Sequence, residues 1–318
     1  MGCNPTIKDD SYKFFDNIEN YIKKVDDAQQ NRVTTEITSK CKGIYYTMSS
    51  SFENELIATS VCEEIVKLYK SLDKIKGKSK CSKDNNNDCE FFNYWVNFQI
   101  SKSRFNESNC IYHIYDAIES QFTGTDHYDV NIELIYDIKK DELDKMNILY
   151  RLYKIYTDLD NILDNKTKDT KELLLSYSTA CCTDYLEANY LCSGGNDDNN
   201  SNIQFCTQLE NFKTKYIGLY ERVDRNGPEY TNNFKRLTQC DNNTVSTALI
   251  GTTVGLVPLL VGLYKFTPLR QLINSNKGKL TQEYRNNDDE RRNIMLMDQG
   301  SEHISSQQGT YNIKYHSV

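Results

Sequence analysis

The chain has 318 residues and a formal net charge of −7, with 38 basic and 45 acidic side chains. Nucleic-acid binding depends on neutralising phosphates with basic side chains, so this acidic balance argues against a nucleic-acid partner. The length is enough for one or two domains that each have a hydrophobic core.

Helical periodicity is the main pattern in the first three quarters of the chain. Proline is scarce, with four residues, and the alternating β-branched runs that indicate strands are absent. Apolar residues recur every three or four positions instead, which places them on one face of a helix. Ser50 and Glu53 form a capping-box pattern that predicts a helix start ahead of the second such set. The two sets are Phe14, Ile18, Tyr21 and Val25, and Ile57, Val61, Ile65, Leu68, Leu72 and Ile75.

The longest predicted helix covers residues 131–165. Its two neighbouring seams of Leu, Met and Tyr form a wide apolar face, as expected for the central helix of a bundle. Polar loops are predicted where Asn, Asp, Gly and Ser cluster, at 78–88 and 193–202. Further helices are predicted over 170–191, 203–222 and 229–237. The expected fold is therefore all-α, a cysteine-rich helical bundle.

A single uncharged stretch near the C-terminus, residues 245–264, predicts a transmembrane helix. About 20 apolar residues in a helix cross the ~30 Å hydrocarbon core of a bilayer, and no other segment has this length without charge. Pro258 is compatible with a span, because transmembrane helices tolerate proline. The sequence thus predicts three parts: a helical, disulfide-stapled ectodomain (1–244), the transmembrane helix (245–264) and a polar cytoplasmic tail (265–318).

Small residues line one face of this predicted span and indicate weak self-association. Ala248, Gly251, Gly255 and Gly262 recur at helical spacing, and Gly251 and Gly255 form a GxxxG pattern. Such residues let two helix backbones approach closely in a membrane, which predicts a weak homodimer. The alternative is that small residues are simply common in spans.

All 11 cysteines precede the predicted span. Thiols confined to one side of a membrane indicate an oxidising side with disulfides and a reducing cytosol on the other side. The alternative is that they are buried free thiols in the core. The odd count leaves at least one thiol unpaired, and Cys3 is the expected one. The disulfide candidates are Cys41, Cys62, Cys81, Cys89, Cys110, Cys181, Cys182, Cys192, Cys206 and Cys240.

The pairing of these cysteines cannot be read from the sequence, but local bridges are one option. Cys81 and Cys89 flank the first polar loop, and Cys182 and Cys192 flank the break that precedes the second. Bridges at these places would close small loops at helix ends and restrict the unfolded chain.

The two ends of the chain give mixed signals about orientation. Four basic residues between Lys265 and Lys279 follow the span without an acidic residue, which favours a cytosolic tail. The N-terminus has no basic-then-apolar leader, so the export route stays open. Gly2 and Cys3 fit an acylation pattern, which would hold the N-terminus at the cytosolic leaflet instead.

No catalytic constellation is recognisable in the sequence. The four histidines are scattered, and the patterns HExxH, GxGxxG and GxSxG do not occur. Cys110 and His113 have a metal-like spacing, but no second pair completes a site. We therefore expect a binding or display module without catalytic, cofactor-binding or metal-ligating residues.

Several motifs resemble one known family. They are Cys89-Glu-Phe-Phe-Asn-Tyr-Trp95, Cys181-Cys182-Thr-Asp-Tyr-Leu with Cys192, Phe205-Cys206 with Asn211-Phe212-Lys213, and Leu263-Tyr-Lys-Phe-Thr-Pro-Leu269 at the end of the predicted span. In this order they resemble the Plasmodium interspersed repeat (PIR) superfamily, especially its vir-type members.

The resemblance implies a variant antigen of a malaria parasite, with a cysteine-stapled helical ectodomain and one membrane span. It also implies display on, or export to, the infected red cell, and roles in antigenic variation, immune evasion and adhesion. The implied partners of the ectodomain are a host-cell receptor or antibodies. The alternative is an intracellular membrane-anchored scaffold, with the helical domain in the cytosol and its thiols free.

Overall fold

The computed structural model describes residues 3, 11–75, 86–106, 109–122, 135–193 and 202–240, and this part of the chain is mostly helical. The chain divides into two compact units, Met1–Pro268 and Leu269–Val318, and every described residue lies in the first. The predicted all-α, disulfide-containing fold is confirmed for this part.

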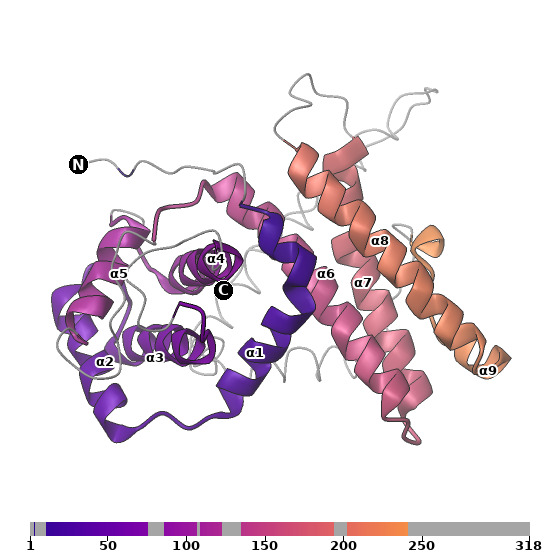
Figure 1. Ribbon diagram of the computed structural model, residues 1–318, viewed down its shortest axis with the longest axis horizontal. Helices are drawn as coiled ribbons and strands as arrows, with labels where there is room; N and C mark the ends of the chain where they lie inside the picture. Colours follow the sequence, from indigo (N-terminus) through magenta and orange to yellow (C-terminus); the bar gives the residue numbers. More distant parts are fainter. Residues whose placement is uncertain are drawn as a thin grey trace, which may run out of the picture. The chain divides into compact units, whose positions relative to one another are not determined.

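Five helices and a preceding 3-10 helix form the first packed group. They are η1 (Lys13–Asn17), α1 (Ile18–Gln30), α2 (Thr35–Thr47), α3 (Glu55–Ser71), α4 (Asn86–Ser103) and α5 (Ile111–Ser120). Helix α3 contacts α1, α2 and α4, while α5 contacts α2 and α4 (Figure 1). Both predicted apolar sets are buried in this group.

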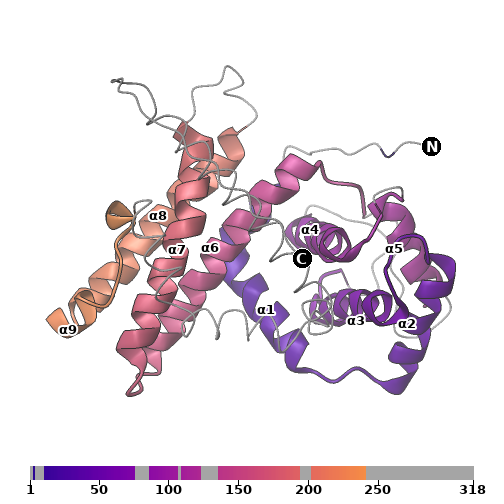
Figure 2. The same ribbon diagram turned by 180° about the vertical axis from the view of Figure 1, so that it is seen from behind.

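A second group follows, built on the longest helix. Its elements are α6 (Lys140–Asp164), α7 (Thr170–Ser193), α8 (Ile203–Asp224), the short α9 (Pro228–Thr231) and the 3-10 helix η3 (Leu237–Gln239). Helix α6 contacts α7 and α8 and also α1 and α4 of the first group, so it is the central helix that the sequence predicts. Figure 2 shows α6, α7 and α8 packed together, with α6 in contact with both of the others.

The start of α3 differs from the predicted capping box. The helix begins at Glu55, and the side chain of Asn54 accepts a hydrogen bond from the Ile57 amide at 3.0 Å. Asn54 thus satisfies one of the amides that a helix start leaves free. Ser50 and Glu53 lie in the preceding turn instead, where Phe105 donates its amide to the Ser51 carbonyl at 2.7 Å.

The central helix is shorter at its start than predicted, because residues 135–139 are held in a non-helical conformation by α4. Asn97 accepts a hydrogen bond from the Ile138 amide and donates one to the Tyr136 carbonyl, both at 2.9 Å. Asn93, one turn earlier on α4, accepts the Tyr136 amide at 3.0 Å. With their backbone groups bound to side chains, these residues do not need helical hydrogen bonds.

The last predicted helix, 229–237, is also wrong in extent. Only Pro228–Thr231 is α-helical, and residues 232–236 lead to η3 in a non-helical conformation. Helices α7 and α8 agree with their predictions to within two residues at each end.

Within the described residues, no helix has the length and apolar character needed to cross a bilayer. The predicted span, its small-residue face (Ala248, Gly251, Gly255 and Gly262) and the tail all lie outside those residues. The division into ectodomain, span and tail therefore stays a prediction.

Candidate functional site: the disulfide-anchored segment 234–240

Four disulfides join described cysteines, and they connect parts of the chain that are far apart. They are Cys3–Cys110, Cys41–Cys62, Cys182–Cys240 and Cys192–Cys206. Cys89 is disulfide-bonded as well, and Cys81 lies outside the described residues. Cys181 is a free thiol, buried between α7 and α8.

The expected unpaired thiol was therefore misassigned. Cys3 is bonded to Cys110, and Cys181 is free instead. The physical reason is the turn of the helix: neighbouring residues on α7 point about 100° apart. Cys182 thus faces Cys240, while Cys181 faces the interior beside the hydroxyl of Tyr216.

A local bridge between Cys182 and Cys192 is also excluded by the helix. Both residues lie on the continuous helix α7, so their Cα atoms are about 15 Å apart along its axis. A disulfide needs Cα atoms within about 7 Å. Cys192 instead bonds Cys206 near the start of α8 and so closes the connection between the two helices.

The described chain ends in a segment that lies on α7 and α8, here called the clasp segment (residues 234–240). Phe234 at its start is buried, and its ring lies 5.2 Å from that of Tyr216 and 6.0 Å from that of Tyr220. Arg236 places its guanidinium carbon 3.9 Å from the centroid of the Tyr220 ring, a cation–π contact. Aromatic packing therefore fixes the first half of the segment.

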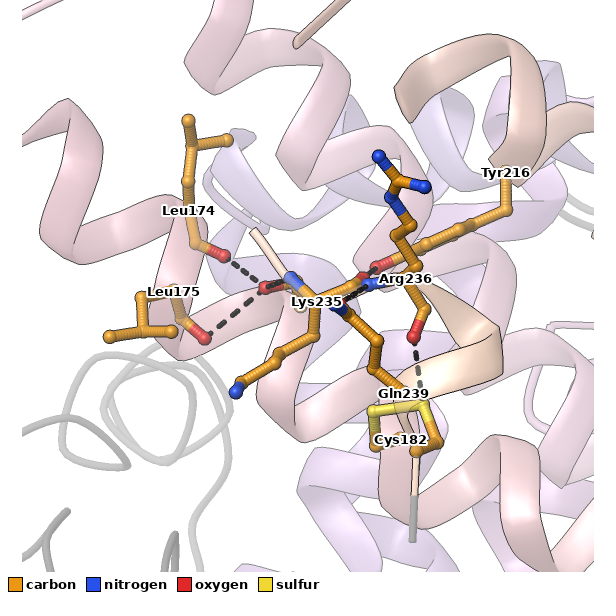
Figure 3. Close-up of a disulfide and its surroundings, with 9 residues drawn as sticks. Leu174, Leu175, Cys182, Tyr216, Lys235, Arg236 and Gln239 are labelled. Atoms are coloured by element: carbon orange, nitrogen blue, oxygen red, sulfur yellow. Dashed lines mark hydrogen bonds between the residues drawn. A yellow bond between two sulfur atoms is a disulfide. The ribbon is translucent and has the colours of Figure 1, made fainter. Parts of the chain in front are cut away.

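Both backbone polar groups of Lys235 are bound by side chains from different helices (Figure 3). The Lys235 amide donates to Ser178 Oγ of α7 at 3.0 Å, and its carbonyl accepts from the Tyr216 hydroxyl of α8 at 2.9 Å. Ser178 in turn donates to the Leu174 carbonyl at 2.6 Å. This single residue therefore ties the segment to two helices at once.

The disulfide completes the attachment. Cys240 and Cys182 have their Cα atoms 5.1 Å apart and are separated by 58 positions in the sequence. Between the two attachment points, the Gln239 side chain accepts a hydrogen bond from the Arg236 amide at 2.9 Å and closes η3. The segment is thus fixed at Lys235 and again at Cys240.

The free thiol beside the clasp segment, Cys181, is fully buried. Burial raises the pKa of Cys181 far above its ordinary value, with a further contribution from Asp184. Burial likewise raises the pKa of Tyr216. A buried thiol that stays protonated is a poor nucleophile.

The cysteines do not build a metal centre in the described part of the chain. The one grouping there with metal-like geometry is Cys3, Cys110 and Asp137. The two sulfur atoms are bonded to each other, and the Asp137 carboxylate accepts the Ile111 and Tyr112 amides, each at 3.0 Å, at the start of α5. The donor atoms of this grouping are therefore already engaged in other bonds.

Large apolar side chains are exposed at two main places. Around the α2–α3 connection lie Tyr46, Leu56 and Phe105, here called the α2–α3 patch, with Tyr46 75% and Phe105 79% exposed. Near the α7–α8 connection lie Tyr190, 77% exposed, and Ile203. Nothing in the sequence periodicity singled out these residues, because isolated exposed aromatics carry no pattern.

Fold and site together define a disulfide-rich helical domain whose C-terminal segment is cross-linked to its own bundle. Residues 226–318 match the family model described as Plasmodium vivax Vir protein. The match confirms the resemblance to vir-type members of the PIR superfamily, and it includes α9 and the whole clasp segment. No curated protein and no solved structure matches the chain.

Proposed function

We propose that this chain is a single-pass, membrane-anchored variant antigen without catalytic activity, displayed on or exported to the infected red cell. The observation that carries the proposal is the set of long-range disulfides together with the Vir family match. Disulfides of this kind persist in oxidising surroundings and not in a reducing cytosol. They therefore support a helical domain that faces away from the cytosol.

The arrangement also suits a surface that varies while its fold persists. Cys192 and Cys206 cross-link the two helix ends on either side of the polar segment 194–201. Asn202 adds a hydrogen bond from its side chain to the Leu191 carbonyl at 3.3 Å. Because the helix ends are held by these bonds, changes in the intervening sequence cost little stability. Such tolerance is what antigenic variation and immune evasion require.

Adhesion would use exposed aromatic side chains. The α2–α3 patch presents Tyr46 and Phe105 with most of their surface in solvent. Aromatic anchors of this kind dominate the energy of protein interfaces. The occupant would be a host-cell receptor or an antibody.

The membrane anchor in this proposal is residues 245–264, with residues 265–318 in the cytosol. Within the membrane, Gly251 and Gly255 would allow two copies to associate weakly. Replacing Gly255 by Ile is expected to reduce association in a bilayer reporter assay. An unchanged signal would remove dimerisation from the proposal and leave the anchor intact.

Two antibodies test the display proposal on intact infected red cells. Antibodies to the folded domain should label unfixed cells, or the exported compartment after gentle permeabilisation, whereas antibodies to residues 265–318 should label only after permeabilisation. Labelling confined to the parasite's own cytosolic membranes would favour the scaffold alternative. Alkylation without reductant is the independent check, since a scaffold in the cytosol would present every accessible cysteine as a free thiol.

A further inference from the structure

The described chain leaves the helical domain at the middle of α7 and not at one of its ends. Cys182, which holds Cys240, is 12 residues from Thr170 and 11 from Ser193. At about 1.5 Å per residue, these ends are roughly 18 Å and 16 Å away along the helix axis. The Cα atom of Cys240 lies only 5.1 Å from that of Cys182, so the exit point is fixed halfway along the helix.

Only four residues, 241–244, separate this exit point from the predicted span. The five Cα-to-Cα steps from residue 240 to residue 245 reach at most about 17 Å when fully extended. If α7 stood upright with either end at the membrane, the link from Cys240 to the span would need almost all of its extended length to reach the bilayer. With α7 lying along the membrane, the link has to pass only the radius of one helix, about 5 Å. The short link therefore favours the second orientation.

The clasp segment prevents the link from being lengthened. Unwinding it would break the Cys182–Cys240 disulfide and the bonds that Ser178 and Tyr216 make to Lys235, and would expose Phe234. These interactions act together, so the effective start of the tether stays at Cys240.

The outward face of α7 suits a lipid surface. Leu175, Thr183 and Tyr190 are exposed, and their spacing places them close to one helix face. The same face also carries the exposed carboxylates of Glu172 and Glu187. At the edge of this face Arg151 pairs with Asp184 at 2.7 Å and with Glu187 at 3.6 Å. Leucine and tyrosine side chains are favourable at the headgroup level, and the exposed carboxylates of this face are repelled by anionic lipid, so the suitable surface is a zwitterionic one.

We propose that the exposed face of α7 lies against a zwitterionic phospholipid bilayer and holds the domain side-on; this rests on the proposed span. Helix α6 separates α7 from α1–α5 in both ribbon views (Figures 1 and 2), and α6 contacts α1 and α4. The first group of helices then lies on the side away from the membrane. The α2–α3 patch is presented outward as a result.

The test uses the full-length protein in phosphatidylcholine vesicles that carry nitroxide-labelled headgroups. A small fluorophore is introduced through a non-natural amino acid either at Thr183, on the α7 face, or at Tyr46, in the α2–α3 patch. Nitroxides quench only nearby fluorophores, so we expect several-fold stronger quenching at position 183. Equal quenching at the two positions, or stronger quenching at position 46, overturns the side-on orientation.

Two further variants separate this inference from the proposed span. A 12-residue Gly/Ser insertion after Asn243 lengthens the tether and should lower the quenching at position 183; unchanged quenching would overturn the argument from link length. Co-flotation with vesicles is measured for the full chain and for a deletion of 245–264. Failure of the full chain to float overturns the span and this inference together, whereas flotation without position-dependent quenching overturns the inference alone.

Discussion

The helices around α4 and the helices that bear the clasp segment are stabilised by different means. Around α4 the core is aromatic: Phe91 lies 4.3 Å from Tyr21 and 5.5 Å from Phe14, measured between ring centroids. The clasp segment has one buried aromatic residue, Phe234, and depends on hydrogen bonds and a disulfide. The first region thus combines a large aromatic core with disulfides such as Cys41–Cys62, whereas the clasp segment has little apolar burial beside its disulfide.

Because of this contrast, reduction of the disulfides should affect the two regions unequally. Reduction leaves the aromatic packing around α4 in place, but it removes the covalent link at the end of the clasp segment. The order of the clasp segment, next to the predicted membrane anchor, therefore depends strongly on an oxidising environment. The region that carries the α2–α3 patch also has a disulfide, Cys41–Cys62, but it keeps its buried apolar residues when that bond is reduced.

The largest effect should come from truncating the aromatic core. Phe91→Ala removes a fully buried ring from contact with Phe14, Tyr21 and Tyr94 and should lower the free energy of unfolding by about 3–5 kcal/mol. Denaturant unfolding of the oxidised domain, followed by Trp95 fluorescence, measures it. The matched control is Phe105→Ala at a 79% exposed position, which should change the value by less than about 0.5 kcal/mol. Similar losses for both variants would contradict the assignment of the core.

The disulfides provide the next comparison. Replacing Cys182 and Cys240 together by Ser opens a link across 58 positions, whereas replacing Cys192 and Cys206 opens one across 14. By loop-closure entropy the losses are about 4 and about 3 kcal/mol, so the first double variant should be the less stable one. Urea denaturation of both double variants checks the order. The reverse order would mean that the clasp segment is held mainly by its non-covalent contacts.

A smaller loss is expected from the polar face of α4. Asn97→Ala removes the partners of the Ile138 amide and the Tyr136 carbonyl, both of which lie in the non-helical segment before α6. Leaving such groups unpaired costs about 1–3 kcal/mol. Hydrogen exchange should show faster exchange at Ile138 than in the parent protein. If exchange there is unchanged, Asn97 does not hold the segment.

The sequence predicted the helices well where one rule decides the outcome. The apolar sets of α1 and α3 recur at helical spacing, and burial of that face follows directly. The start of α6 was wrong because Asn93 and Asn97 are 40 or so residues away from the backbone they bind. Periodicity within a window carries no information about a partner at that distance.

The site was less predictable than the fold for a similar reason. One-sided cysteines correctly indicated disulfides, but their pairing depends on which residues the tertiary structure brings within about 7 Å. Of the two adjacent cysteines on α7, Cys182 forms a disulfide and Cys181 stays free. The direction in which the helix points each side chain decides between them. The clasp segment is bound by Ser178 and Tyr216. Serine and tyrosine are common in helical bundles, so nothing in the sequence singled out these two.

The smallest effect is expected from a variant that removes one attachment point of the clasp segment and keeps the other. Ser178→Ala removes the acceptor of the Lys235 amide while the Cys182–Cys240 disulfide remains. One hydrogen bond contributes about 1 kcal/mol, and the disulfide limits how far the freed segment can move. We therefore expect a loss of about 1 kcal/mol in the oxidised protein, with hydrogen exchange at Lys235 accelerated. After reduction, the same substitution should accelerate exchange over the whole stretch from Phe234 to Cys240, because only the Tyr216 bond to the Lys235 carbonyl and the packing of Phe234 then hold the segment. Equal exchange profiles in both redox states would show that aromatic packing of Phe234 alone holds the segment.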